Sequence, residues 1–163
     1  MHDTETNAHS LCKACGLCCD GTLFDHARLA PEDDRGVVDA AGIRLRDDRT
    51  SFHLPCPAYK DICTIYDDRL RICGEFRCNL LIKYMEGTAG YEAAFEIISR
   101  VKALSSKLRK QMADITGQDG QPLRSAYMTV RAIGDDSHRA MLLDYAVLLH
   151  HIRKHFAKSR SGA

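Results

Sequence analysis

The chain has 163 residues and a mass of 18.2 kDa, which suits one ordinary domain and leaves no room for a second of full size. Its composition, 45% apolar and 28% charged, argues against global disorder. The formal net charge of +1 excludes the overall basic field of a protein that binds mainly nucleic-acid phosphates. No apolar run approaches the ~20 residues that cross a bilayer. The polar residues 1–10 do not resemble a secretory signal, so we expect a cytoplasmic protein without a membrane segment.

The first half of the chain is expected to be irregular. Residues 1–10 are predicted to be a disordered tail. Alternating apolar and polar residues predict short extended segments at 42–45 and 50–54, with a turn at Asp47-Asp48 between them. Asp67 and Asp68 precede a helical pattern that predicts a helix over 69–86, with Gly87 beyond its end.

The second half of the chain is expected to be helical. Apolar residues three and four apart predict a helix over 91–115 and another over 137–156. The stripe of the first consists of Phe95, Ile98, Val101, Leu104, Leu108, Met112 and Ile115. Residues 125–133 fit a short helix or an extended segment equally well, and 158–163 are predicted to be a second disordered tail.

The predicted fold class is therefore mainly α, with a cysteine-rich, irregular, metal-nucleated N-terminal half packed on C-terminal helices. Residues 11–157 are expected to form one domain, which comprises a cysteine-cluster region at 11–90 and a helical region at 91–157. No internal repeat is present.

All eight cysteines lie between Cys12 and Cys78, in two blocks. The first block is a C-x2-C-x2-C-C run and the second spreads over 23 residues: Cys12, Cys15, Cys18 and Cys19, then Cys56, Cys63, Cys73 and Cys78. In a reducing compartment, clustered cysteines favour metal or cluster ligation over redox dithiols and structural disulfides. Two intervening residues allow a tight turn to aim both sulfurs at one ion. The spacing thus indicates that these thiolates are assembled around metal.

The adjacent pair Cys18 and Cys19 limits how the thiols are shared. Neighbouring residues rarely place both sulfurs on one tetrahedral ion, so these two are expected to serve different ions, or one of them to stay unligated. Eight thiolates suffice for two four-cysteine sites, but the sequence does not assign the ligands to each. Four thiolates around a divalent ion leave a charge of −2, which needs nearby donors or cations when it is buried. Six cations are interleaved with the cysteines: Lys13, Lys60, Arg69, Arg71, Arg77 and Lys83.

The combined cysteine pattern resembles a known bacterial family. The residues that carry the resemblance are Cys12-x2-Cys15-Gly16-x-Cys18-Cys19, Leu54-Pro55-Cys56-Pro57, Cys63-Thr64-Ile65-Tyr66, Arg69, Cys73 and Phe76-x-Cys78. They are similar to the C-x-x-C-x-x-C-C family of zinc- or iron-chelating proteins, and more distantly to the cysteine region of flagellin lysine-N-methylases. The resemblance covers residues 12–78 and implies that the eight cysteines bind metal. Leu70 and Gly74 stand where the family usually has proline and often has arginine.

The identity of the metal remains open between two choices. The C-x2-C-G turn and the even number of cysteines favour zinc. Three cysteines at two-residue spacing with a distal fourth are also typical of an iron–sulfur cluster. Soft thiolate sets accept both metals, so the expected cofactor is zinc or iron, with an iron–sulfur cluster included.

Other candidate sites are weaker. His151 and His155 lie four residues apart on the last predicted helix, among cations, and we interpret them as solvated. His53, three residues before Cys56, is an alternative ligand. No phosphate loop, dinucleotide fingerprint or nucleophile elbow occurs, so no catalytic residue is predicted.

Two functions of different classes follow. The first is a metal-binding protein whose C-terminal helices complete the core or present a surface to a protein partner. The alternative is a metal-dependent enzyme or accessory factor of protein modification, such as lysine methylation. The chain shows no cofactor motif, and aromatic residues, only 7% of the chain, do not alternate with cations as in single-strand nucleic-acid binders. Metal binding is therefore the favoured interpretation.

Overall fold

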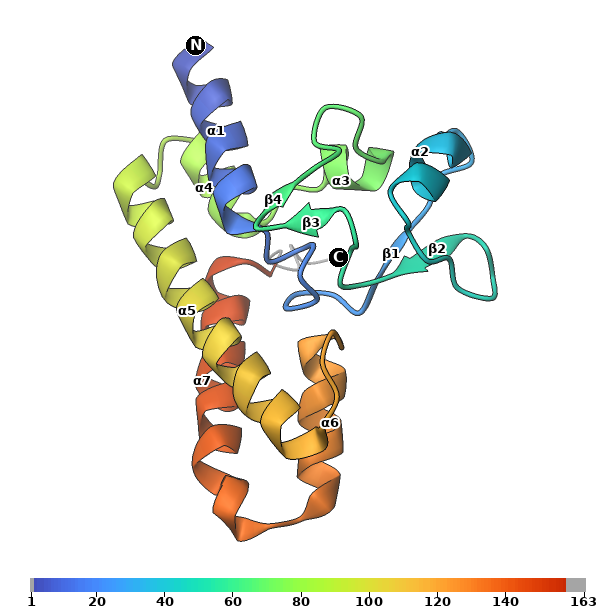
Figure 1. The fold of residues 1–163 in the computed structure, drawn as a ribbon. Coiled ribbons are helices and arrows are strands. Elements are labelled where there is room, and N and C mark those ends of the chain that lie inside the picture. Colours follow the sequence, from blue (N-terminus) through green and yellow to red (C-terminus); the bar gives the residue numbers. More distant parts are fainter. Residues whose placement is uncertain (1, 158–163) are drawn as a thin grey trace, which may run out of the picture.

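The structure is a computed structural model that describes residues 2–157, with side chains from residue 4 onward. The described chain is mainly helical and carries two very small sheets (Figure 1). In chain order its elements are α1 (His2–Cys15), β1 (His26–Arg28), α2 (Arg35–Ala40), β2 (Ser51–His53), β3 (Tyr59–Lys60), β4 (Ile62–Cys63), α3 (Arg71–Glu75), α4 (Asn79–Met85), α5 (Tyr91–Thr116), α6 (Leu123–Ile133), the 3-10 turn η1 (Asp136–His138) and α7 (Arg139–His155).

The N-terminal residues differ from the prediction of a tail. Residues 2–10 are helical and form most of α1, which ends at Cys15. Ala8 and Leu11, three residues apart, are 4% and 2% exposed, because α1 packs against α4 and α5. A pair of apolar side chains on one helical face thus docks a segment whose composition is otherwise polar. The predicted tail at 158–163 lies outside the described residues.

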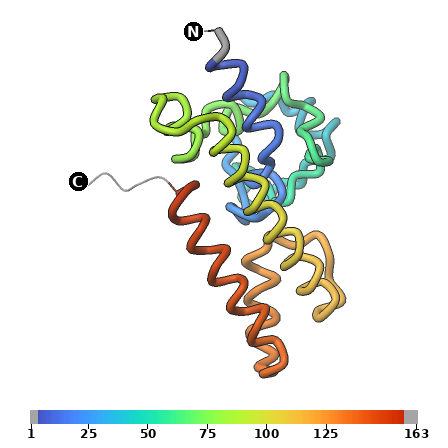
Figure 2. The backbone as a smooth tube through the Cα atoms, turned by 90° about the vertical axis from the view of Figure 1, so that its left-hand side faces the viewer, coloured from blue at the N-terminus to red at the C-terminus, as the bar shows by residue number. Residues whose placement is uncertain are grey.

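The helical half is a bundle of α5, α6 and α7 (Figures 1 and 2). Residues 125–133, whose conformation the sequence left open, belong to α6. The predicted helices at 91–115 and 137–156 are confirmed as α5 and as α7 with its preceding η1 turn. Gly117 and Gly134 end α5 and α6 in the left-handed region, with φ of 67° and 72°, as glycine allows without strain.

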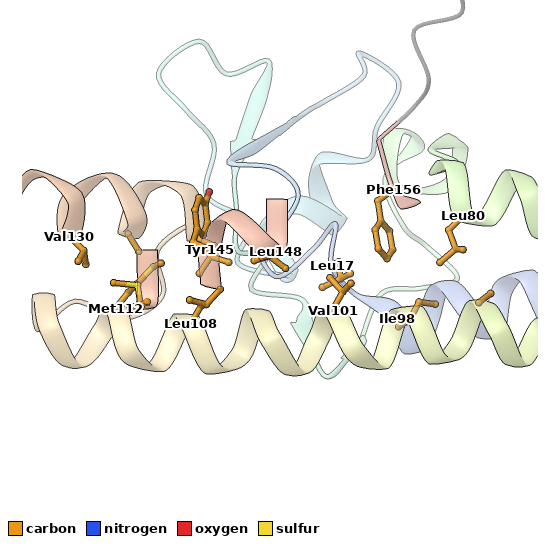
Figure 3. Packing of buried hydrophobic residues seen from close by; sticks show 14 of the residues in the cluster. Leu17, Leu80, Ile98, Val101, Leu108, Met112, Val130, Tyr145, Leu148 and Phe156 are labelled. Atoms are coloured by element: carbon orange, nitrogen blue, oxygen red, sulfur yellow. The ribbon is translucent and has the colours of Figure 1, made fainter. Parts of the chain in front are cut away.

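The main core lies along the inner face of α5. Figure 3 shows Ile98 and Val101 near Leu17 of the cysteine-rich half, and Leu108 and Met112 near residues of α6 and α7. The predicted apolar stripe is shifted slightly: Phe95 is 42% exposed, whereas Ser105 is buried and donates to the Lys102 carbonyl at 3.0 Å. One core therefore joins the two halves of the chain. We call it the helical core.

A second, smaller core holds the strands. β1 and β2 pair antiparallel, with Ala27 opposite Phe52. The predicted extended segments at 42–45 and 50–54 do lie side by side, through a bridge between Leu45 and Phe52. Asp48 fills the turn between them, accepting from the amides of Thr50 and Ser51. The buried members of this small core are Leu29, Val38, Ile43, Phe52, Leu54 and Leu70.

The prediction of one continuous helix over 69–86 is wrong. It is broken into α3 and α4, and the residues between them are extended, with Phe76 at φ −65° and ψ 128°. Leu70, not Asp67 or Asp68, precedes the first helical residue. The Arg77 guanidinium replaces the lost helical bonds by donating to the carbonyls of Gly74 and Phe76, at 2.5 and 3.2 Å. The break turns Cys73 and Cys78 toward different neighbours.

Among the described residues, every helix is too short or too polar to cross a bilayer. Figure 2 shows the cysteine-rich half and the far ends of α6 and α7 at opposite ends of the molecule, with α5 running through both.

Candidate metal centre

All eight cysteines line a single cavity between α1, the small sheets and the α3–α4 break. The cavity has a volume of about 330 Å³, and all eight cysteines are free thiols. Residues up to 66 positions apart in the sequence, Cys12 and Cys78, share its wall. We call it the thiol cavity. Cys12 and Cys73 are exposed at its surface and the other cysteines are partly buried.

Four of the thiols come together around the C-terminal end of α1. Cys12 and Cys15 lie one turn apart on this helix, and Cys18 follows in the turn after Gly16. Cys78 immediately precedes α4, which packs on α1. These thiols act on one another electrostatically: after burial, the neighbour that most raises the pKa of Cys12 is Cys78. We call this set the first thiol group: Cys12, Cys15, Cys18 and Cys78.

The other four thiols face each other across the loops and small strands. The amide of Cys56 donates to the carbonyl of Cys19 at 2.7 Å, which fixes these two residues side by side. Cys63 lies on β4, opposite Tyr59 of β3, and Cys73 lies on α3. Burial, followed by the thiols of Cys73, Cys56 and Cys63, raises the pKa of Cys19. We call this set the second thiol group: Cys19, Cys56, Cys63 and Cys73.

Adjacent Cys18 and Cys19 are assigned to different groups by their other neighbours, although Cys19 also raises the pKa of Cys18, and by more than Cys78 or Cys12 does. That the two cysteines serve different ions stays a prediction. The thiols surround the cavity more loosely than a coordination sphere. Among the residues described, no three or more His, Cys, Asp or Glu side chains form a set that already could hold a metal ion. The donor chemistry thus fits a soft metal, although the thiols of the described residues are not arranged as a metal site.

Backbone amides point at several of the sulfurs. The Leu17 amide bonds to Cys15, the Ala58 amide to Cys56, and the Leu81 and Leu80 amides to Cys78. In each case the donors lie two or three residues after the cysteine. Hydrogen bonds of this kind lower the thiol pKa, because they stabilise the thiolate.

Burial acts in the opposite direction and is the stronger effect. It raises the pKa of Cys15 from 9.0 to about 12, and that of Cys73 likewise to about 12. Burial also raises the pKa of Cys18 well above 9.0. A buried thiolate without a compensating cation is costly. In the metal-free protein these thiols therefore remain protonated at neutral pH.

Cations reach the thiol cavity from the cysteine-rich half. Arg69 donates to the Tyr66 carbonyl at 2.7 Å and lies 4.0 Å from the centre of the Tyr66 ring. Its charge lowers the pKa of both Cys12 and Cys73, one thiol of each group, against the dominant effect of burial. Lys13 lies over the same ring at 4.3 Å. The cavity is lined by four cations in all: Lys13, Arg28, Arg69 and Arg77.

The interleaved cations predicted from the sequence do not all reach the thiols. Among them, Lys13, Arg69 and Arg77 line the cavity, whereas Lys60, Arg71 and Lys83 do not. Arg71 instead pairs with Glu32 and Glu75 on the surface.

Two cations of the helical half were missed by sequence reasoning. Lys102 of α5 donates to the Ala14 carbonyl at 2.8 Å and lies 3.4 Å from the Tyr59 hydroxyl. Arg109 of α5 donates to the carbonyls of Asp20 and Gln121, at 2.7 and 2.8 Å. From across the molecule they bond to the backbone within the first cysteine block, at Ala14, and directly after it, at Asp20. Their position outside the apolar stripe of α5 is the only signal of this in the sequence.

The histidine candidates lie elsewhere. His53 does not line the thiol cavity, whereas His26 does. The rings of His151 and His155 stack at 6.0 Å on α7, and burial followed by the Lys154 charge lowers the pKa of His155. No set of three metal-binding side chains that includes them is found among the described residues.

Comparison with known proteins adds no relative: no family model matches the chain, and the curated proteins and solved structures contain no significant match.

Proposed function

We propose that this protein binds two metal centres, zinc or iron, through its eight cysteine thiolates, one centre in each thiol group. The observation that carries the proposal is the convergence of all eight free thiols on one cavity. Their division into two sets of four matches the ligand number of a tetrahedral zinc site or a four-cysteine cluster. The sequence resemblance to zinc- or iron-chelating proteins agrees with it.

The charges around the cavity support two centres. A divalent ion held by four thiolates carries a net charge of −2, so two such ions carry −4. A [4Fe–4S]²⁺ cluster on four thiolates carries the same charge as one such ion. Four cations line the thiol cavity, and none of the described residues that line it is Asp or Glu. The opposite charges therefore balance, which offsets the cost of burying the thiolates.

Elemental analysis of anaerobically purified protein tests the proposal directly. We expect about two zinc ions per chain in a colourless protein, or iron with acid-labile sulfide in a brown protein that shows sulfide-to-iron charge transfer. Reduced, folded protein without bound metal, before and after incubation with either metal, would refute the proposal.

Paired substitutions test the grouping of the thiols. Cys12→Ser combined with Cys78→Ser removes two ligands of the first thiol group, so about one centre should remain. Cys12→Ser combined with Cys73→Ser removes one ligand from each group and should weaken both centres. Because each variant has lost two thiols, each is the control for the other. Equal metal contents would contradict the proposed division, and circular dichroism would confirm that the helices of both variants are retained.

A further inference from the structure

The thiol cavity carries a charge pattern that bears on how metal enters it. Its lining includes four cations and no carboxylate among the described residues. Two carboxylates outside the lining are already engaged: Asp20 lies 3.8 Å from Arg109, and Asp33 accepts from the amides of Ala30 and Arg71. The charged side chains that line the cavity are therefore all cationic, while Asp20 and Asp33 act on the thiols from outside the lining.

The walls between the thiols are apolar. Phe24 and Phe76 meet edge to face at 5.3 Å, and both line the cavity together with Ile72. A hydrated divalent cation would have to approach fixed positive charge and lose its water against hydrocarbon, and both steps are unfavourable. Metal sites that collect free cations are instead lined by carboxylates, which attract such ions.

A negatively charged complex that carries the metal would instead be attracted by these cations. Exposed Lys13 and Arg28 lie at the surface of the cavity, and each thiol group has one exposed member, Cys12 in the first and Cys73 in the second. We propose that the cavity takes up its metal as an anionic metal–thiolate complex, which the cations attract and which the exposed thiol attacks first. This inference rests on the proposed function.

The exchange balances in atoms and charge. A dianionic tetrathiolate complex of zinc enters with four metal–sulfur bonds. Each protein thiol forms one new metal–sulfur bond and gives its proton to the donor thiolate whose bond breaks. Four donor thiols leave as neutral molecules, and the net charge of −2 stays with the metal in the cavity. No electron is transferred and no other reactant is needed.

The salt dependence of the loading rate tests the proposal. The donor is the zinc–dithiothreitol complex [Zn(DTT)₂]²⁻, and zinc chloride serves as the cationic comparison. Reduced, metal-free protein is mixed with each, and bound zinc is measured by elemental analysis after timed rapid desalting. Between about 20 mM and about 500 mM NaCl, screening should slow loading from the anionic donor, by roughly tenfold, and should not slow loading from zinc chloride.

Charge variants identify the responsible residues. Lys13→Gln with Arg28→Gln should slow loading from the anionic donor several-fold at low salt and flatten its salt dependence. Arg131→Gln with Arg139→Gln is the matched control, because these exposed arginines lie on α6 and α7 and neither lines the cavity. The final zinc content of the control variant should equal that of the unaltered protein.

The outcomes separate this inference from the proposed function. The proposal of anionic entry would be overturned if the loading rate changed neither with salt nor between the charge variants while the final zinc content stayed full. Metal binding itself would then remain intact. Faster loading from zinc chloride that slows with salt would do the same. Absence of bound zinc at equilibrium from either donor would overturn both.

Discussion

Gly16 shows how a single residue shapes the thiol cavity. It follows the first C-x2-C turn with a φ of 63°, in the left-handed region that glycine occupies without strain. The Tyr59 side chain occupies the space beside it, so a Cβ added there would lie 2.0 Å from the Tyr59 hydroxyl oxygen. Tyr59 in turn lies 3.4 Å from the Lys102 amine. The glycine thus allows a ring of the second cysteine block to pack on the first.

Gly16→Ala should destabilise the protein beyond the conformational cost alone. Gly42→Ala is the matched control, because Gly42 has a φ of 65° and no atom within 4 Å of an added Cβ. We expect a loss of about 1 kcal/mol for Gly42→Ala and about 2–4 kcal/mol for Gly16→Ala, since the latter also displaces an aromatic ring. Urea unfolding measures both, and equal losses would show that Tyr59 does not pack there.

The raised thiol pKa values predict how the metal-free protein responds to pH. Burial raises the pKa of Cys15 and Cys73 from 9.0 to about 12. Above pH 9 the unfolded chain releases these protons while the folded chain keeps them, so the free energy of unfolding falls as pH rises from about 9 to about 12. Urea unfolding of reduced, metal-free protein at about pH 8 and about pH 10 should show this fall. A stability that rises over this range would contradict the burial of these thiols.

Metal binding should depend on pH in the opposite sense. Thiols that are protonated in the metal-free protein must release protons when they become ligands, so the affinity for zinc rises as pH increases toward the thiol pKa values. Competition with a chelator of known affinity at several pH values measures this. A pH-independent affinity, after correction for the chelator, would mean that the thiols are already ionised.

At the scale of elements, the docking of α1 determines where half of the first thiol group lies. Cys12 and Cys15 lie on its last turn, while Leu11 inserts into the helical core at 2% exposure. The break between α3 and α4 does the same for Cys73 and Cys78. The early start of α1 and the break between α3 and α4 therefore place four of the eight thiols.

Leu11→Ala should undock α1 and disturb the first thiol group. Removing this buried side chain is expected to cost about 2–4 kcal/mol, whereas Ser10→Ala, at the exposed neighbouring position, should cost less than about 0.5 kcal/mol. Urea unfolding measures both costs. If residues 2–10 were a tail and Leu11 were solvated, the two variants would be equally stable.

At the scale of the whole molecule, the two halves are stabilised differently. Among the described residues, the helical core contains fifteen buried apolar residues, of which only Leu11, Leu17 and Leu80 come from the cysteine-rich half, and the small core contains six. The cysteine-rich half thus has few buried side chains for a segment with many irregular loops, because the conformational entropy of ordering each residue must be offset. We therefore expect metal ligation to contribute much of the order in residues 16–78.

Removal of the metal should loosen the molecule unevenly. After chelation in the presence of reductant, hydrogen exchange should accelerate in residues 16–78, because ligands there lose their shared partner. The amides of α5, α6 and α7 should keep their protection, since their contacts are apolar and lie in the helical core. Mass spectrometry of the exchanged peptides measures this, and an equal loss of protection in both halves would contradict it.

Part of this fold and site follows from local pattern. The stripes of α5 and α7 are visible because a helix repeats every 3.6 residues and each contributes several turns to one apolar face. The turn at Asp47-Asp48 is visible because short acidic side chains bond to nearby amides. By contrast, the helix over 69–86 was predicted as continuous because its apolar spacing persists across Phe76. The break coincides with tertiary contacts that the spacing does not contain, since Phe76 meets Phe24 and the Asn79 amide donates to the Phe156 carbonyl.

By itself, the sequence determined the mainly helical character of the chain and the confinement of all eight cysteines to one half, since these depend on composition and periodicity. Only the tertiary structure decided which thiols share a group, and that Lys102 and Arg109 of α5 hold the cysteine turns. Those relations join residues far apart in the chain, and they exist only once α1, α4 and α5 pack together.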